Sequence, residues 1–243
     1  MPVLDVFLYA LITALATGLG ALPFLFVREM PERLLGLGNA VAAGLMLAAS
    51  FRLVTEGLTY NAPRLVIGVL IGLVLIVVAQ RWLSSYEHLN VGQLEGAGAL
   101  KALLIVGVMT IHSFAEGVGV GVSFGDSLNF GLFVTIAISV HNIPEGLAIS
   151  LILIPQGVTV WRAAFWSVVS SLPQPLVAVP AFLFVATFEP FLPVGLGLAA
   201  GAMIWMATAE LLPDALENAP KEQIATTLTV AVAFMVALQA WLR

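Results

Sequence analysis

Eight long apolar stretches follow one another along the chain, and they restrict its fold more than any other feature does. Each is long enough for a helix that crosses a bilayer, which takes roughly 20 apolar residues. Short joints, polar or bearing proline and glycine, separate them. We therefore predict an all-α integral membrane protein with a single transmembrane domain over residues 1–243, whose eight spans lie at about 4–26, 33–57, 63–85, 99–123, 127–153, 158–187, 191–216 and 219–242.

The composition supports lipid as the main solvent of the chain. Only 9% of the 243 residues are charged and 60% are hydrophobic, whereas a soluble domain carries about 25% charged residues. Cysteine is absent, which excludes a disulfide framework and thiolate ligands. The net charge of −5 argues against a nucleic-acid partner. The first apolar stretch lacks a basic leading segment, so we expect a retained span rather than a cleaved signal peptide.

Basic residues near the span ends predict the orientation, because Lys and Arg concentrate on the cytoplasmic side of membrane proteins. An outside N-terminus puts three basic residues on the outer side and six on the inner side. The outer three are Arg52, Arg64 and Arg243, and the inner six are Arg28, Arg33, Arg81, Lys101, Arg162 and Lys221. We therefore predict that both termini are outside. The joint at residues 125–127 is so short that spans four and five must be antiparallel neighbours.

Two histidines lie inside predicted spans, and each is followed by a glutamate four residues later. The pairs are His112 with Glu116 and His141 with Glu145. Ionisable side chains at this depth are costly and indicate a functional site. Residues four apart share one face of a helix, so each pair offers a nitrogen and a carboxylate to the same point. The two segments also resemble each other, which predicts an internal pseudo-symmetry of a kind common around transporter sites.

Imidazole together with carboxylate suits Zn²⁺ and neighbouring transition metals, here Cd²⁺, Mn²⁺, Fe²⁺ and Co²⁺. Mg²⁺ and Ca²⁺ prefer shells of oxygen alone. We therefore predict a transporter of divalent metal ions, with the metal as cargo, no resident cofactor and no enzymatic activity. Two alternatives stay open. One is an intramembrane metal-dependent hydrolase with the same ligands, and the other is a membrane scaffold or sensor whose pairs are structural hydrogen bonds.

Further polar and soft residues give weaker signals. Met46 supplies either a soft sulfur ligand or ordinary packing. Gln174 lies between two prolines, where a broken helix fits either a functional cavity or a structural kink. Glu210 and Asp214 are four residues apart toward the inner end of the seventh span, which predicts an acidic exit path for a cation.

The fifth span carries a motif that resembles the His-Asn-x-Pro-Glu-Gly signature of the ZIP (Zrt/Irt-like) metal transporters: His141-Asn142-Ile143-Pro144-Glu145-Gly146. Residues 42–47, 171–175 and 201–213 are similar to the second, sixth and seventh spans of the GufA-like bacterial branch. The resemblance implies a multi-pass protein of the cell (inner) membrane, a homodimer, and transport toward the cytoplasm by alternating access with an elevator-like slide of some spans against others.

The resemblance also implies two sets of ligands. The primary site would use His112, Glu116, His141, Glu145 and Met46. A companion site would use Ser113, Asn142, Gln174 and the two shared glutamates Glu116 and Glu145. Two residues of the companion set depart from the family pattern, because Ser113 stands where the family has asparagine and Gln174 where it has glutamate. Both changes remove ligand strength or charge, so we predict one strong site beside a weak companion.

Overall fold

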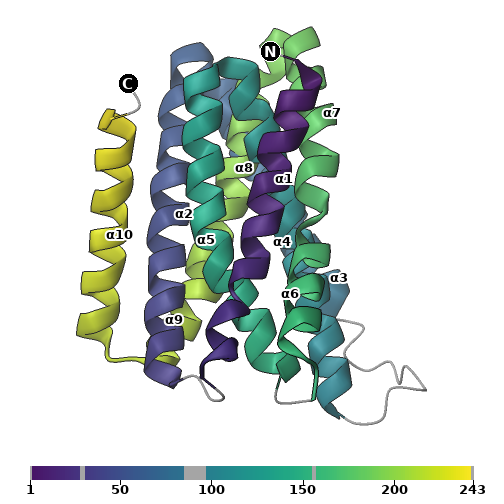
Figure 1. The fold of residues 1–243 in the computed structure, drawn as a ribbon. Helices are drawn as coiled ribbons and strands as arrows, with labels where there is room; N and C mark the ends of the chain where they lie inside the picture. Colours follow the sequence, from purple (N-terminus) through teal and green to yellow (C-terminus); the bar gives the residue numbers. More distant parts are fainter. Residues whose placement is uncertain (1, 28–30, 85–96, 155–156, 242–243) are drawn as a thin grey trace.

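The chain is helical throughout the part that the structure describes. The computed structural model describes residues 2–27, 31–84, 97–154 and 157–241, and its side-chain description leaves out residues 82–84, 97–105, 108, 111–112 and 152. These ranges contain no strand, and their helices stand side by side in one bundle (Figure 1). The predicted all-α class is thereby confirmed.

The helices follow one another with short joints. In chain order they are α1 (Val3–Leu19), η1 (Leu22–Leu25), α2 (Glu32–Tyr60), α3 (Ala62–Ser84), α4 (Ala97–Asp126), α5 (Leu128–Leu153), α6 (Val160–Ser171), α7 (Pro173–Thr187), η4 (Glu189–Phe191), α8 (Leu192–Met206), η5 (Ala207–Leu211), α9 (Leu212–Asn218) and α10 (Lys221–Trp241).

Seven helical segments in the described ranges are long and apolar enough to cross a membrane. They are Val3–Leu25, Glu32–Tyr60, Ala62–Arg81, Leu128–Leu151, Val160–Thr187, Glu189–Asn218 and Lys221–Trp241, and each lies on a predicted span. The predicted span 99–123 lies on α4, where several side chains are outside the description, so the count of eight stays a prediction. Both termini lie at the same end of the bundle (Figure 1). We call this the termini end.

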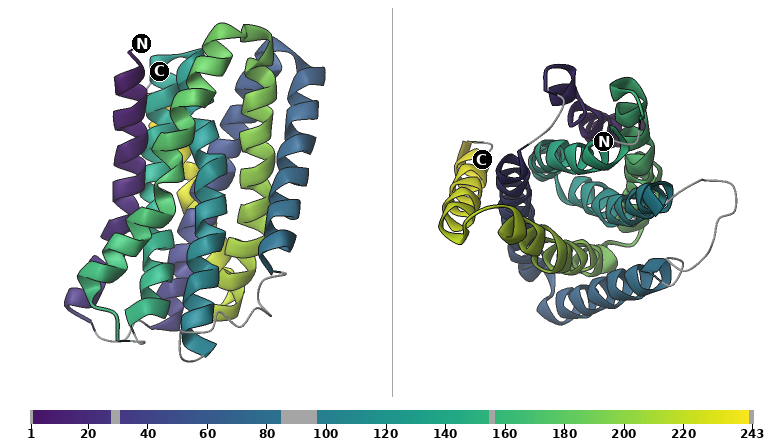
Figure 2. Two further views of the ribbon diagram at one scale, coloured as in Figure 1. Left: turned by 90° about the vertical axis from the view of Figure 1, so that its right-hand side faces the viewer. Right: turned by 90° about the horizontal axis from the view of Figure 1, so that it is seen from below.

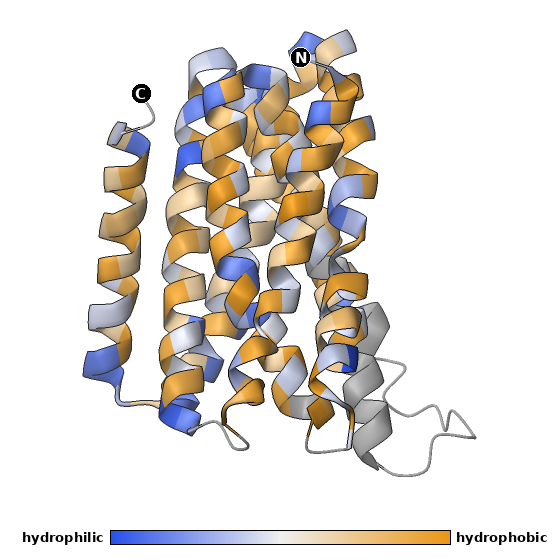
Figure 3. Cartoon of the chain, viewed as in Figure 1, coloured by the Kyte–Doolittle hydropathy of each residue, from blue (hydrophilic) through white to orange (hydrophobic). Residues whose placement is uncertain are grey.

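The outer surface of the bundle is apolar. Hydrophobic residues cover most of the length of the helices (Figure 3), and α3 and α10 lie at the periphery when the bundle is seen along its axis (Figure 2). Leu70 and Val74 on α3 are 55% and 58% exposed, and Val230 and Phe234 on α10 are 63% and 51% exposed. Apolar side chains left uncovered along whole helices fit contact with lipid rather than water.

Two predicted spans are broken helices. Leu172 separates α6 from α7, and Pro173 stands at the start of α7, which confirms the break that the paired prolines predict, because proline lacks an N–H and fits the first helical turn. The seventh span was not expected to change its winding. It passes from α8 through the π-helical turn η5 into α9, and such turns are frequent at functional sites.

The helices pack as two groups, and inside each group glycines allow neighbouring helices to touch backbone to backbone. We call α1, α4, α5, α6 and α7 the site unit, and α2, α3, α8, η5, α9 and α10 the frame unit; each helix packs chiefly against members of its own unit. A Cβ on Gly121 of α4 would lie 2.1 Å from the carbonyl oxygen of Ala178 on α7. In the frame unit, a Cβ on Gly72 of α3 would lie 2.1 Å from the carbonyl oxygen of Leu198 on α8. Helices whose backbones touch so closely have no room to shift against each other.

The boundary between the two units is packed differently. It is formed mainly by α2 against α5 and by α4 against α8. A Cβ on Gly119 of α4 would meet only the Cβ of Ala199, at 3.4 Å, and the sulfur of Met203, at 4.0 Å. A Cβ on Gly38 of α2 would meet only the Cβ of Pro144, at 3.9 Å. At these positions the boundary is a contact of side chains, whereas Gly121 and Gly72 meet backbone inside their units.

Candidate metal site

Three ionisable side chains meet in the buried interior between α4 and α5. Glu116 and His141 are fully buried and Glu145 is 3% exposed. Each can offer one ligand atom, and these atoms all lie within 4.8 Å of one another. The structure thus brings together three of the four ligands that the two His-x-x-x-Glu pairs predict. The side chain of the fourth, His112, lies outside the described residues.

The joint between α4 and α5 explains why these side chains face each other. Ser127 is the one residue between the two helices, and its side chain caps α5 by accepting a hydrogen bond from the N–H of Phe130 at 3.2 Å. So short a turn sends α5 back along α4, which confirms the predicted antiparallel neighbours. His141 and Glu145 are four apart on α5, so both face the same side, where they meet Glu116.

The distances inside the cluster suit a cation site. His141 Nε2 lies 2.6 Å from Glu116 Oε1, and the two atoms share a hydrogen bond. The same nitrogen lies 3.9 Å from Glu145 Oε1. His141 Nδ1 is buried without a hydrogen-bond partner. Two carboxylates in a dry interior repel each other, and a divalent ion between them would offset this repulsion and take the place of the shared proton. The donor set therefore fits a transition metal.

A second layer of polar residues surrounds the cluster. Gln174 Nε2 donates to Glu116 Oε2 at 2.5 Å, and Thr13 Oγ1 donates to Gln174 Oε1 at 2.5 Å. Asn142 Nδ2 donates to the backbone oxygen of Thr13 at 2.8 Å and to Gln174 Oε1 at 3.2 Å. Asn142 Oδ1 is buried without a hydrogen-bond partner. Two of the three neutral residues predicted for the companion site thus bond to each other.

The first helix contributes residues that the sequence did not single out. Thr13 and Thr17 lie one turn apart on α1 and are 0% and 1% exposed. Thr17 Oγ1 lies 2.8 Å from Ser171 Oγ, and Ser113 Oγ is 3.5 Å from the same hydroxyl. Ser113, predicted as a companion ligand, is thus buried beside another serine. Two threonines at helical spacing inside an apolar stretch were the signal that could have indicated this face of α1.

Met46 and the acidic residues of the seventh span lie in the frame unit. Met46 is buried on α2 as part of the main cluster of apolar side chains, so its role as a ligand stays a prediction. Glu210 lies half-buried in η5. Asp214 is exposed on α9 and interacts with Glu210 and Glu217. The exit path predicted for Glu210 and Asp214 stays a prediction.

A cavity of about 810 Å³ opens at the termini end, between the two units. Its lining includes Tyr60 and Arg64 of the frame unit and Asp126 and Ser127 from the joint of α4 and α5. The hydroxyl of Tyr60 donates a short hydrogen bond to Asp126 Oδ1 across this cavity. A second contact crosses the boundary nearby, where the Arg52 guanidinium lies 4.9 Å above the ring of Phe130. Polar contacts therefore connect the units on this side of the bundle.

Fold and site together define a multi-pass membrane protein with a buried His and Glu cluster that suits a divalent transition metal. Comparison with known families gives the particular class. The ZIP zinc transporter family model matches residues 83–239, a range that contains Glu116, His141 and Glu145. The chain belongs to the ZIP zinc transporter family.

Relatives of known name agree with this family. The chain is 51% identical over 241 residues to a predicted zinc transporter of Arabidopsis thaliana, and this match covers 98% of the chain but only 39% of the plant protein. It is 34% identical to the zinc transporter GufA of Myxococcus xanthus, covering 84% of the chain and 86% of that protein. It is 35% identical to the zinc transporter ZIPB of Bordetella bronchiseptica, covering 92% and 76%. These names indicate a transporter rather than an enzyme.

Proposed function

We propose that the chain carries divalent transition-metal ions, with Zn²⁺ foremost, across the cell (inner) membrane toward the cytoplasm. The observation that carries this proposal is the buried meeting of Glu116, His141 and Glu145. His112, which shares a helix face with Glu116, completes the ligand set, and Met46 is a further candidate. The zinc transporters GufA and ZIPB support zinc as the cargo, and imidazole with carboxylate also accepts Cd²⁺, Mn²⁺, Fe²⁺ and Co²⁺.

The division into two units supports alternating access as the mechanism. The three described ligands all belong to the site unit, so a slide of this unit against the frame unit would carry the ion without changing those ligands. The backbone contacts at Gly121 and Gly72 hold each unit together, while the boundary at Gly119 and Gly38 is looser. This arrangement supports the elevator-like slide that the family resemblance implies.

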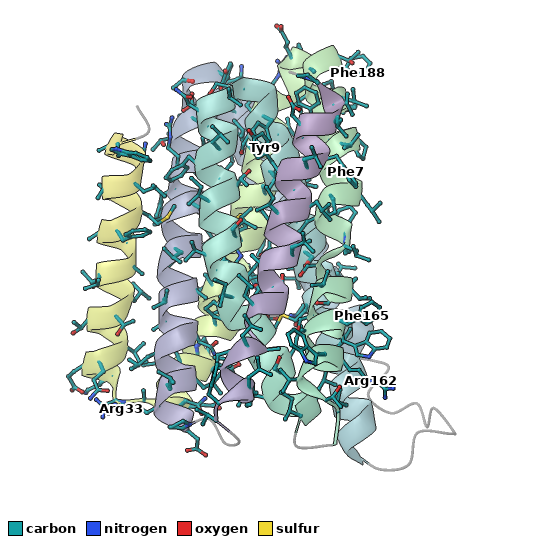
Figure 4. All side chains as sticks on the ribbon, viewed as in Figure 1. Phe7, Tyr9, Arg33, Arg162, Phe165 and Phe188 are labelled. Atoms are coloured by element: carbon teal, nitrogen blue, oxygen red, sulfur yellow. The ribbon has the colours of Figure 1, made fainter. Side chains whose placement is uncertain are left out.

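The exit path runs past the acidic side chains of the frame unit. The like charges of Glu210 and Glu145 repel each other, and Asp214 lies beyond Glu210 at the surface. Arg33 and Arg162, both predicted at the inner side, lie at the end opposite the termini (Figure 4). We therefore assign that end to the cytoplasm and the termini end to the outside. A homodimer, expected from the family, stays a prediction.

The proposal is tested by metal uptake into proteoliposomes. We expect uptake of Zn²⁺ by the intact protein and loss of uptake to the level of empty liposomes for His141→Ala and Glu145→Ala, because each change removes a ligand from the buried cluster. Glu222→Gln is the matched control, because Glu222 is an exposed carboxylate at the start of α10. A panel of Zn²⁺, Cd²⁺, Mn²⁺, Fe²⁺ and Co²⁺ ranks the cargo. Unchanged uptake in both variants, with folding intact, would exclude this site.

The same measurement separates transport from the alternative hydrolase. An intramembrane metal-dependent hydrolase would use the cluster to bind a resident metal and activate a water, and it would give no flux of metal into liposomes. The family and the named relatives speak for a transporter, and no described observation favours the hydrolase.

Uptake is expected to depend on pH. Metal ligands must be free of protons, so protons compete with the ion for the histidine and carboxylates. We expect uptake to rise between about pH 5 and pH 8, the range in which histidine ordinarily titrates. Initial rates in proteoliposomes with equal pH on both sides give the profile. A flat profile over this range would contradict histidine as a ligand.

A further inference from the structure

The side chain of Gln174 lies between the metal cluster and the first helix. Its amide nitrogen reaches Glu116 Oε2 at 2.5 Å, and its amide oxygen reaches Thr13 Oγ1 at the same distance. Gln174, Glu116, Thr13 and Asn142 are each 0% exposed. An amide in such a dry place is held by its hydrogen bonds, since losing one of them leaves a buried polar atom unpaired.

The chemistry of its neighbours fixes which way round the amide lies. Its oxygen faces Asn142 Nδ2, whose orientation is fixed because the same nitrogen donates to the backbone oxygen of Thr13. It also faces the Thr13 hydroxyl, which shares its one proton between this oxygen and the backbone oxygen of Ala10 at 2.7 Å. Turning the amide over would set an NH₂ group against Asn142 Nδ2 and an oxygen against the Glu116 carboxylate. Donor would then face donor, and acceptor would face acceptor. The N–H of Gln174 therefore points at Glu116, and Thr13 and Asn142 together keep it there.

In this arrangement the two carboxylate oxygens of Glu116 have different partners. Oε2 accepts from Gln174, while Oε1 faces His141 Nε2 at 2.6 Å. The amide oxygen of Gln174, the atom with which it would bind a metal, already accepts two hydrogen bonds. Both ends of the Gln174 amide are therefore occupied by hydrogen bonds, and Gln174 does not serve as a metal ligand of the companion site.

We propose that Gln174 is a positioning residue rather than a ligand: held by Thr13 and Asn142, it orients Glu116 toward His141, and the site takes one divalent ion per chain. The inference rests on the proposed function for the identity of the cargo. It assigns a role to Thr13, and it replaces the ligand role that the family resemblance implies for Gln174.

Zn²⁺ binding to the purified full chain in detergent tests the proposal without any transport step. Calorimetric titration is expected to give one Zn²⁺ per chain. Thr13→Val keeps the size of the side chain but removes the donor, and we expect it to weaken Zn²⁺ binding. Groups that orient metal ligands typically contribute about 10–100-fold in affinity, so Gln174→Met, which removes the whole amide, is expected to weaken binding within that range.

Two controls separate positioning from folding. Thr13→Ser keeps the hydroxyl and is expected to restore the affinity of the intact chain. Thr17→Val removes the hydroxyl one turn along the same helix, where it contacts Ser171 instead, and is expected to leave the affinity unchanged. Elution volume and melting temperature show whether each variant is folded. In uptake assays, Thr13→Val should raise KM for Zn²⁺ by the same factor as the dissociation constant, with kcat little changed.

A carboxylate at the same position gives the converse test. Gln174→Glu sets a third acidic group against Glu116, and a second cation would offset their repulsion, so we expect the stoichiometry to rise from one Zn²⁺ to two. Two ions bound to the intact chain would overturn the proposal, as would equal affinities for the intact chain, Thr13→Val and Gln174→Met. A chain that binds one Zn²⁺ but does not transport it would contradict the proposed function alone. A chain that binds none would overturn both.

Discussion

Gly146→Ala is expected to abolish metal transport and to destabilise the protein severely. A Cβ on Gly146 would lie 1.7 Å from the carbonyl oxygen of Thr17 and 2.7 Å from its carbonyl carbon. Both are backbone atoms of α1, so a change of side-chain rotamer cannot relieve the overlap. Helix α1 would have to move away from α5, and Thr13 would move with it. Overpacking a close contact costs about 1–3 kcal/mol and occasionally more, and we expect this change at the upper end.

Melting temperature in detergent and Zn²⁺ uptake check this expectation. Gly38→Ala is the matched control, because a Cβ there would meet only the Cβ of Pro144 at 3.9 Å, an ordinary contact on the other side of α5. Surface-like changes of this kind usually stay within about 0.5 kcal/mol, and alanine favours the helix. A melting temperature of Gly146→Ala equal to that of Gly38→Ala would show that α1 and α5 are not packed backbone to backbone.

The helix pairing behind this contact was only partly predictable from the sequence. The spacing of His141 and Glu145 put both side chains on one face of a helix, and the short joint at Ser127 made α4 and α5 neighbours. These are local relationships, and the structure confirms them. The break before Pro173 was equally local, because a proline fixes its own backbone. The π-helical turn at residues 207–211 has no comparable residue signature, and it was missed.

The role of α1 could not be read from local patterns. Thr13 receives a hydrogen bond from Asn142, a residue 129 positions away in the sequence, and nothing near Thr13 indicates which helix it will face. The same holds for the two units. A glycine in a membrane helix indicates a close approach, but it does not say whether the partner is a backbone, as for Gly121 and Gly72, or a side chain, as for Gly119 and Gly38.

The second large effect is expected at the termini end, where Tyr60 bonds to Asp126. Tyr60 ends α2 in the frame unit and Asp126 ends α4 in the site unit. A slide of one unit against the other would separate them and would also part Arg52 from Phe130. We therefore expect that a covalent cross-link between positions 60 and 126 stops metal uptake completely, while Zn²⁺ binding persists. The chain has no cysteine of its own, so Tyr60→Cys with Asp126→Cys introduces the only reactive pair.

The distance between positions 60 and 126 decides which cross-link is suitable. A direct disulfide needs Cα atoms within about 7 Å, whereas Tyr60 and Asp126 meet through the full length of a tyrosine side chain, so a short cleavable bifunctional thiol reagent is the suitable link. Uptake is expected to return when the reagent is cleaved. Tyr60→Phe, which keeps the ring and removes the hydroxyl, is expected to leave uptake above the background, because the hydrogen bond favours one position of the units but is not required for their movement.

A second cysteine pair shows whether the link itself or its position stops transport. Arg33 Nε donates to Gln223 Oε1 at 2.8 Å, and α2 and α10, which carry these residues, both belong to the frame unit. Arg33→Cys with Gln223→Cys should therefore be linked just as readily, and a slide between units leaves their separation unchanged. We expect full uptake from this pair after linking. If the 60–126 link also permits full uptake, the units do not move apart at the termini end. The ion would then have to cross by a rearrangement within the site unit, where the glycine contacts leave the least room for one.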